Sequence, residues 1–207
     1  SSWVVSFGCI AGIAAAGYVL WPRQPPDLLV LGDSVTFQAS PAIERRLSTR
    51  FHLQVDAYPF YRSTDLEGIL RKIMIRRRSV GRPLDSAVFL VGYNDVLNDQ
   101  VAASALPRMM RDSEAFDCAV WLTLPATPGG RRAASPGFAP ARVEAWNARL
   151  HRLAGGKRHL HISPAWAELV NAPGGEKLLQ ADGIHPAEEG RVTLAAAIEI
   201  AIEDSCR

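Results

Sequence analysis

The sequence predicts an α/β protein with a doubly wound parallel sheet flanked by helices, preceded by one N-terminal transmembrane helix. Short apolar runs alternate with amphipathic stretches along most of the chain. The runs are mostly unbroken, which is typical of parallel strands that are buried on both faces. The first 22 residues, in contrast, carry no charge at all.

Residues 1–22 predict a membrane anchor. The stretch 3–21 has nineteen residues, which as a helix would be about 28 Å long and would cross the hydrocarbon core of a bilayer. Aromatic residues stand near its two ends, as in interfacial belts, at positions Trp3, Tyr18 and Trp21. A cleavable signal peptide stays open as an alternative, because Ala14-Ala15-Ala16 offers a small-residue cleavage site.

Small residues form one stripe on this predicted helix, at Gly8, Gly12 and Ala16. Such a stripe lets two helix backbones approach closely in lipid, which favours a transmembrane-helix partner. The other interpretation is that Gly and Ala are simply common in membrane helices. We expect a single-pass membrane protein whose domain lies on the extracytoplasmic side.

A Pro-rich linker over residues 23–27 leads into one domain over 28–207. Strands are predicted at 28–32, 53–57, 87–92, 118–124 and 158–163. Helices are predicted at 41–50, 64–78, 99–115, 140–154 and 186–203. The alternation implies right-handed crossovers and a flavodoxin-like sheet, in which active residues gather at the carboxyl ends of the strands.

Several residues at these ends have side chains that can take part in catalysis. Ser34 stands where the first strand ends and the chain turns into a helix, and its hydroxyl needs a base to become a good nucleophile. His185 is a candidate base at a helix start, and Asp182 can orient its imidazole and stabilise the charged form. Asn94 follows the third strand, so its side-chain amide could donate to a developing oxyanion.

Three segments resemble sequence blocks of the SGNH (GDSL-type) hydrolase family and occur in that family's order. They read LLVLGDSVTFQ, VFLVGYNDV and DGIHP. The resemblance implies that Ser34 is the nucleophile, His185 the base and Asp182 its orienting carboxylate. It also implies an oxyanion hole made of the Ser34 backbone N–H, the Asn94 amide and an N–H from the loop after the second strand.

That loop departs from the family pattern. The family has a Gly there, but residues 57–65 contain none, and Tyr61 or Arg62 stands at about its place. Pro59 has no N–H to offer. Because Gly supplies a positive φ and a close approach of the backbone, we expect Tyr61 or Arg62 to be strained or to turn its N–H away.

Composition and motifs limit the cofactors and partners. The net charge of +2 and the absence of G-x-G-x-x-G and G-K-[ST] motifs give no reason to expect nucleic acid or a nucleotide. Catalysis is therefore expected to need no cofactor. No metal is expected either, because the remaining histidines show no ligand spacing; they are His52, His151, His159 and His161.

Two further groups of residues have alternative interpretations. Cys118 is interpreted as a buried small hydrophobic residue, while a disulfide with Cys206 stays open. A basic cluster near the end of the second predicted helix is either a solvated helix end or a contact for anionic headgroups or a polyanionic substrate. Its members are Arg71, Lys72, Arg76, Arg77, Arg78 and Arg82.

The expected function is that of a membrane-anchored serine esterase. It would act on a carboxylic ester of a lipid or an envelope glycan through an acyl-Ser34 intermediate, and transfer of the acyl group to a second alcohol would use the same residues. The alternative is a catalytically weak SGNH-like accessory subunit of a membrane complex. The small-residue stripe and the missing Gly favour this alternative, whereas the intact Ser, His, Asp and Asn favour the enzyme.

Overall fold

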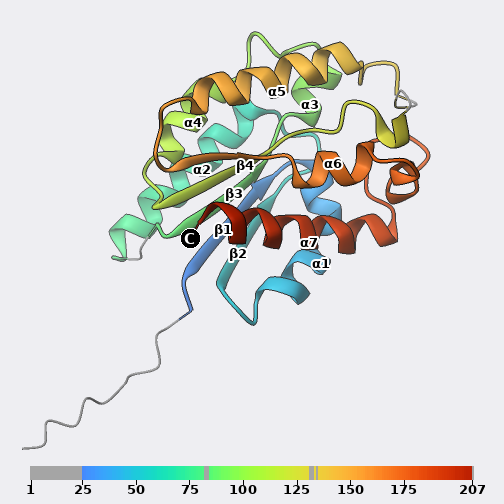
Figure 1. The fold of residues 1–207 in the computed structure, drawn as a ribbon. Helices are drawn as coiled ribbons and strands as arrows, with labels where there is room; N and C mark the ends of the chain where they lie inside the picture. The colour runs from blue at the N-terminus through green and yellow to red at the C-terminus, as the bar shows by residue number, and fades with distance from the viewer. Residues whose placement is uncertain (1–24, 82–83, 131–132, 134, 207) are drawn as a thin grey trace, which may run out of the picture.

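A computed structural model describes residues 25–81, 84–130, 133 and 135–206 and shows three layers, with one sheet between two layers of helices (Figure 1). All five strands are parallel, in the order β2-β1-β3-β4-β5. They are β1 (Asp27–Gly32), β2 (His52–Ala57), β3 (Ser86–Leu90), β4 (Cys118–Leu122) and β5 (Leu160–Ser163). This order confirms the doubly wound sheet, and its topological switch point lies between β1 and β3.

Helices cover both faces of the sheet. They are α1 (Ser34–Leu47), α2 (Ser63–Ser79), α3 (Tyr93–Leu97), α4 (Leu106–Ser113), α5 (Pro140–Ala154), α6 (Ala165–Asn171) and α7 (Glu188–Ser205), with short 3-10 turns at η1 (Pro128–Gly130) and η2 (Gly175–Leu178). In Figure 1, α1 and α7 lie together on one face, and α2, α4 and α5 lie on the other. All six residues of β1 are consequently buried, which explains its unbroken apolar run.

The predicted start of the first helix is wrong. Helix α1 begins at Ser34 rather than at residue 41, because the Asp33 side chain caps it by accepting from the Val35 N–H. Pro41, a residue type that often starts a helix, lies inside α1 instead.

The predicted helix 99–115 is also too long. Residues 98–105 form a loop and α4 begins only at Leu106, with Pro107 in its first turn. Two short helices, α3 and α6, follow closely on β3 and β5 and were not predicted from the sequence.

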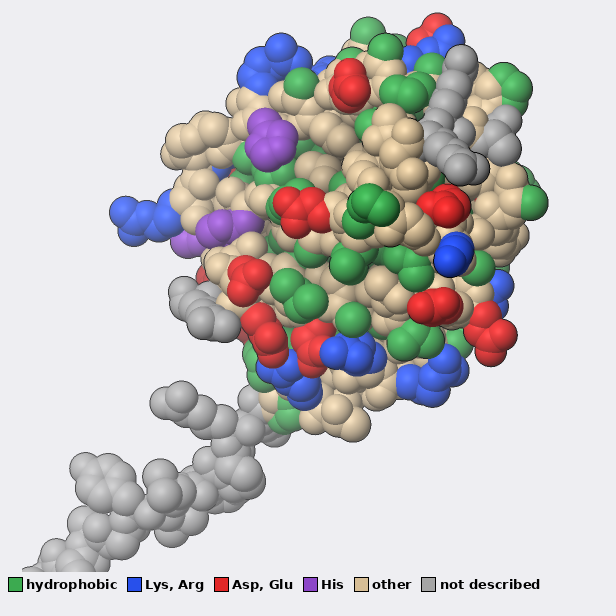
Figure 2. Space-filling model, turned by 45° about the vertical axis from the view of Figure 1, so that its right-hand side comes forward, with side chains coloured by type: hydrophobic (Ala, Val, Ile, Leu, Met, Phe, Trp, Pro, Cys, Tyr) green, Lys and Arg blue, Asp and Glu red, His purple; other side chains and the backbone are tan. Residues whose placement is uncertain are grey.

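The predicted anchor 3–21, with its stripe at Gly8, Gly12 and Ala16, and the first two residues of the linker 23–27 lie outside the described residues. Within the part of the chain that the structure describes, no helix combines the length and apolar character needed to span a bilayer. On the face seen in Figure 2, charged side chains of both signs and scattered hydrophobic ones are interspersed.

A disulfide joins Cys118 at the start of β4 to Cys206 just beyond α7, across a sequence separation of 88 residues. Cys118 is buried as expected, but it is not a free thiol. A bond that closes so long a loop restricts the unfolded chain strongly.

Replacing Cys206 with Ser should lower the free energy of unfolding by about 2–5 kcal/mol, measured by urea denaturation. Reducing agent should destabilise the wild-type protein by the same amount and leave Cys206→Ser unchanged. Equal denaturation midpoints for wild type with and without reducing agent would show that the bond does not contribute.

Candidate active site

The end of β1 places Ser34 at the carboxyl edge of the sheet. Gly32 closes the strand where no other residue would fit, since a Cβ there would lie 2.0 Å from the Thr36 Oγ1 and 2.8 Å from the Leu90 carbonyl oxygen. Asp33 caps the helix, and Ser34 is its first residue, only 8% exposed. The Ser34 hydroxyl therefore lies at a helix N-terminus, where free N–H groups favour negative charge.

The loop before α7 brings His185 and Asp182 to this hydroxyl. His185 Nε2 lies 3.0 Å from Ser34 Oγ, and His185 Nδ1 lies 2.7 Å from Asp182 Oδ2. The other oxygen of Asp182 accepts from the backbone N–H groups of Ile184 and His185 at 2.9 and 3.0 Å. The three predicted residues thus form one hydrogen-bonded chain.

The electrostatics of Asp182 suit an orienting carboxylate. Partial burial raises its pKa, but the hydrogen bonds from the His185 ring and from the Ile184 and His185 N–H groups outweigh burial, so the net pKa is below the ordinary value. Asp182 is consequently ionised at neutral pH and can stabilise a positive charge on His185.

Asn94 reaches the same edge from α3, at the switch point of the sheet. Its Nδ2 donates to the Tyr61 carbonyl oxygen at 3.0 Å, so one of its two amide hydrogens is engaged. Gly92 holds the turn before α3 with φ 124°, and a Cβ there would lie 2.2 Å from the Trp146 ring. The position of Asn94 therefore depends on a glycine that packs against α5.

The loop after β2 lacks the Gly that the family pattern has there. Positive φ falls on Phe60 (67°), not on Tyr61 or Arg62. The Arg62 N–H donates to the Asp65 carboxylate at 3.0 Å, as part of a capping box for α2. The Tyr61 N–H, by contrast, has no acceptor among the described residues. Tyr61 is therefore the better placed of the two predicted donors.

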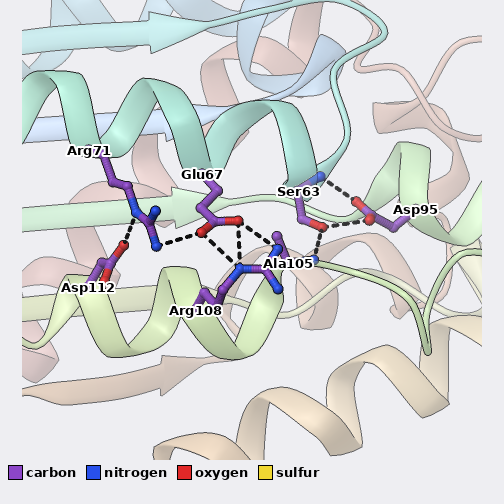
Figure 3. A network of polar contacts seen from close by, with 7 residues as sticks. All are labelled: Ser63, Glu67, Arg71, Asp95, Ala105, Arg108 and Asp112. Atoms are coloured by element: carbon purple, nitrogen blue, oxygen red, sulfur yellow. Dashed lines mark hydrogen bonds and ion pairs between the residues drawn. The ribbon is translucent and has the colours of Figure 1, made fainter.

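A polar network holds this loop against α3 (Figure 3). Buried Asp95 accepts from the Ser63 N–H at 2.8 Å and from its hydroxyl at 2.7 Å, and the Ser63 hydroxyl accepts from the Ala105 N–H at 3.0 Å. Farther along α2, Glu67 binds Arg108 of α4. Because Asp95 neighbours Asn94 and Ser63 closely follows Tyr61, the network keeps the two candidate donors together.

Asp33 has a structural role that was not predicted from the sequence. Its fully buried carboxylate accepts from the Val35 N–H at 3.2 Å and, across the sheet, from the Tyr93 N–H at 3.1 Å. It thereby ties the start of α1, with Ser34, to the start of α3, with Asn94. The cap position directly before Ser34 was the only signal of this in the sequence.

Burial raises the pKa of Asp33 from 3.8 to about 7, although N–H groups of Val35, Tyr93 and Gly92 oppose the rise. The folded state then holds more protons than the unfolded state between these values, so stability should fall as the pH rises from about 4 to about 7. The slope should be at most roughly 1.4 kcal/mol per pH unit for this carboxyl. Thermal unfolding of wild type and Asp33→Asn across this range checks the sign.

Asp95, whose pKa burial also raises, adds a slope of the same sign. Asp33→Asn should therefore show a reduced slope that is not zero. A variant with the full wild-type slope would show that Asp33 does not titrate in this range.

No group of three His, Cys, Asp or Glu side chains within the described ranges is arranged to hold a metal ion.

No curated protein matches the chain in sequence. Solved structures of similar fold include the C-terminal catalytic domain of a Streptococcus pneumoniae peptidoglycan O-acetyltransferase, with a methylsulfonyl adduct. That domain is 18% identical with a TM-score of 0.62, and the alignment covers 87% of this chain and 94% of the other.

Two more solved structures resemble the chain. An acetyl xylan esterase of Geobacillus stearothermophilus is 16% identical, with a TM-score of 0.60 and coverage of 86% and 94%. A GDSL-like lipase of Bacteroides thetaiotaomicron is also 16% identical, with a TM-score of 0.61 and coverage of 86% and 88%. At these identities the likeness concerns the fold. Residues 30–191, most of the chain, match the GDSL-like lipase/acylhydrolase family, and the chain therefore belongs to that family of hydrolases.

Proposed function

We propose that the protein is a serine esterase in which Ser34 attacks the carbonyl carbon of an ester. The observation that carries the proposal is the continuous hydrogen-bonded chain from Ser34 through His185 to Asp182. His185 Nε2 takes the proton of the hydroxyl as the new C–O bond forms, and it returns that proton to the leaving alcohol. Asp182 holds the ring and stabilises its charged form.

The second half of the reaction uses the same groups. Water, activated by His185, attacks the acyl-Ser34 carbonyl, and the acid leaves as Ser34 regains its proton. An alcohol that replaces this water would become acylated, so hydrolysis and transfer differ only in the acceptor.

The developing oxyanion needs donors that are free in the resting protein. The Ser34 N–H and the Tyr61 N–H have no acceptor in the described part of the chain, and Asn94 has a second amide hydrogen. We assign these three groups to the oxyanion hole. The Arg62 N–H is left out because it binds Asp65.

Asn94→Ala should lower kcat by roughly 10²–10³-fold, because removal of one oxyanion donor typically has that effect. KM should change little, since the donor acts on the transition state. Steady-state kinetics on p-nitrophenyl acetate measures both. An unchanged kcat in a variant that folds normally would remove Asn94 from the hole.

Phe60→Gly should raise the free energy of unfolding by about 1 kcal/mol, because a non-glycine residue at positive φ is strained. Phe60→Ala is the matched control, since it removes the same exposed ring but keeps the Cβ. If the strain also misdirects the Tyr61 N–H, only the Gly variant should increase kcat. Equal stability of the two variants would show that this backbone is not strained.

We further propose that the substrate is an O-acyl ester of an envelope glycan. The names of two proteins of similar fold refer to acetyl groups on polysaccharides: the peptidoglycan O-acetyltransferase and the acetyl xylan esterase. Release of acetate from acetylated glycan, compared with release of fatty acid from phospholipid, tests this substrate class.

Membrane anchoring through residues 3–21 and an extracytoplasmic domain complete the proposal. The length and aromatic ends of the segment support an anchor. The Cys118–Cys206 disulfide supports an extracytoplasmic location of the domain, because disulfides persist in oxidising compartments. Carbonate washing should leave the full chain in the membrane pellet; recovery in the wash would exclude an integral anchor.

A catalytically weak accessory subunit remains the second candidate. It is favoured by the engaged Asn94 amide and by the positive φ at Phe60, both at the oxyanion hole. The deciding experiment is turnover of p-nitrophenyl acetate by wild type and Ser34→Ala. Equal rates would favour the accessory subunit, whereas a higher wild-type rate supports the esterase.

A further inference from the structure

The last two turns of α2 and the residue that caps them form an unusual exposed surface, which we call the basic end of α2. It consists of Lys72, Ile75, Arg76, Arg78 and Val80. Ile75 is 69% exposed and Val80 is 62% exposed. The three cationic side chains are also exposed, and none has an ion-pair partner within the described ranges.

A solvated helix end explains only part of this surface. Cations in a last turn complement the helix dipole, and those of α1 and α5 occupy such positions too. The dipole gives no reason for two exposed aliphatic side chains among the cations. Cationic and aliphatic side chains side by side are typical of segments that rest on anionic lipid headgroups.

A groove beside the basic end could receive a headgroup. It has a volume of about 590 Å³ and lies between α2 and the edge strand β2, where Lys72, Arg76 and Val80 line one side. Asp56 also lines it, so the groove is not purely cationic.

The basic end lies beside the point where the chain enters the domain. Arg77, buried in the same turn, lies 3.6 Å from the carboxylate of Asp27, the first residue of β1. Figure 1 shows the end of α2 and the start of β1 on the same side of the molecule. Five residues, 22–26, separate Asp27 from the predicted anchor and reach at most about 17 Å.

We propose that the basic end of α2 rests on the anionic headgroup layer of the membrane that holds the N-terminal anchor. This inference rests on the anchoring proposed above.

The proposed contact has a consequence for the orientation of the Ser34 site. Strand β1 starts at Asp27 beside the basic end and finishes at Gly32 beside Ser34. Six residues of strand span about 20 Å, so the Ser34 site faces away from that membrane. The substrate is then an ester on a polymer beyond the headgroups and not a lipid of the same bilayer.

The experiment uses the full chain reconstituted into vesicles of phosphatidylcholine, with or without phosphatidylglycerol. Flotation reports the anchor, and amide hydrogen exchange of residues 69–81 reports the contact. Arg76→Gln/Arg78→Gln removes two of the three cations of the basic end and leaves Lys72. The matched control is Arg45→Gln/Lys177→Gln, which removes two exposed cations from α1 and η2 and gives the same net charge.

The expected result is flotation with both vesicles and exchange slowed by roughly fivefold or more only with phosphatidylglycerol. High salt and Arg76→Gln/Arg78→Gln should abolish the slowing, while the control pair should keep it. Flotation without any slowing would overturn the inference and leave the anchor intact. Flotation only with phosphatidylglycerol, lost in Arg76→Gln/Arg78→Gln, would support the contact and refute the anchor.

A soluble polyanion distinguishes anionic lipid from a polyanionic substrate as the partner of the basic end. Heparin, added to the protein in phosphatidylcholine vesicles, should slow exchange less than phosphatidylglycerol does. Equal or greater slowing by heparin would overturn the lipid proposal in favour of a polyanionic substrate. Absence of flotation with either vesicle would refute both the anchor and the contact.

Discussion

Ser34→Ala should lower kcat for ester hydrolysis by roughly 10⁴-fold or more, because the acyl intermediate can no longer form. The fold and the affinity for ester should persist, since Ala fits the first turn of a helix and the Ser34 hydroxyl bonds to His185, in the loop before α7, rather than within α1. A fluorophosphonate probe provides an independent measurement. It should label Ser34 in the wild type and no residue in the variant.

Ser40→Ala is the matched control, because Ser40 lies on the same helix and its hydroxyl donates to the Thr36 carbonyl. It should keep wild-type turnover and labelling. Labelling that survives in Ser34→Ala would assign the nucleophile to another residue. Full turnover without labelling would point to a mechanism that needs no acyl-enzyme.

His185→Ala should reduce kcat by a similar factor of roughly 10⁴, because the Ser34 hydroxyl then has no base at 3.0 Å. Asp182→Asn should reduce it by roughly 10³–10⁴-fold, since an amide can neither hold the same tautomer nor stabilise a charged ring. The double variant should be little worse than His185→Ala, because the two residues act as one unit. Single-turnover acylation rates check all three.

His161→Ala, on β5, is the control for loss of an imidazole and should retain activity. Asp182→Asn needs a stability control, because its carboxylate also accepts two backbone N–H groups that hold the loop. If Asp182→Asn loses stability but keeps kcat, Asp182 supports the loop and does not assist catalysis. Additive effects in the double variant would likewise contradict a coupled pair.

The proposed oxyanion hole would limit the rate of such an enzyme. Its Asn94 amide is held by the Tyr61 carbonyl, and Tyr61 follows the strained Phe60. A preorganised hole is favourable because no donor has to move during the reaction. The hydrogen bond to Tyr61 fixes Asn94, but it also occupies one of its donors. The kinetic comparison of Phe60→Gly with Phe60→Ala reports which effect is larger.

Local pattern was enough to predict several features of this protein. The strand cores follow from apolar runs, since a parallel strand buried on both faces leaves little choice of residue. Helix α5 was predicted at its observed bounds, because a continuous amphipathic stretch begins with Pro140 and ends before Gly155. The proximity of Asp182 to His185 was also predictable, because three residues of loop bring the two side chains together.

Contacts between distant parts of the chain decided the rest. The position of α3 beside the start of α1 depends on Asp33, whose carboxylate accepts from the Tyr93 N–H, sixty residues away. The Cys118–Cys206 pairing follows from the packing of α7 against the sheet, and spacing alone left it open. Whether Tyr61 or Arg62 offers a free N–H depended on Asp65 and on where positive φ falls.

The sequence by itself determined the fold class, the family and the residue types that meet at the carboxyl edge of the sheet. These properties follow from short-range periodicity and from motifs whose members are neighbours in the chain. Only the tertiary structure decided the disulfide, the bond from Asn94 to Tyr61 and the place of the basic end of α2 beside Asp27. The physical reason is that each of these depends on a pair of groups brought together by the folding of the chain, with no trace in the local pattern around either one.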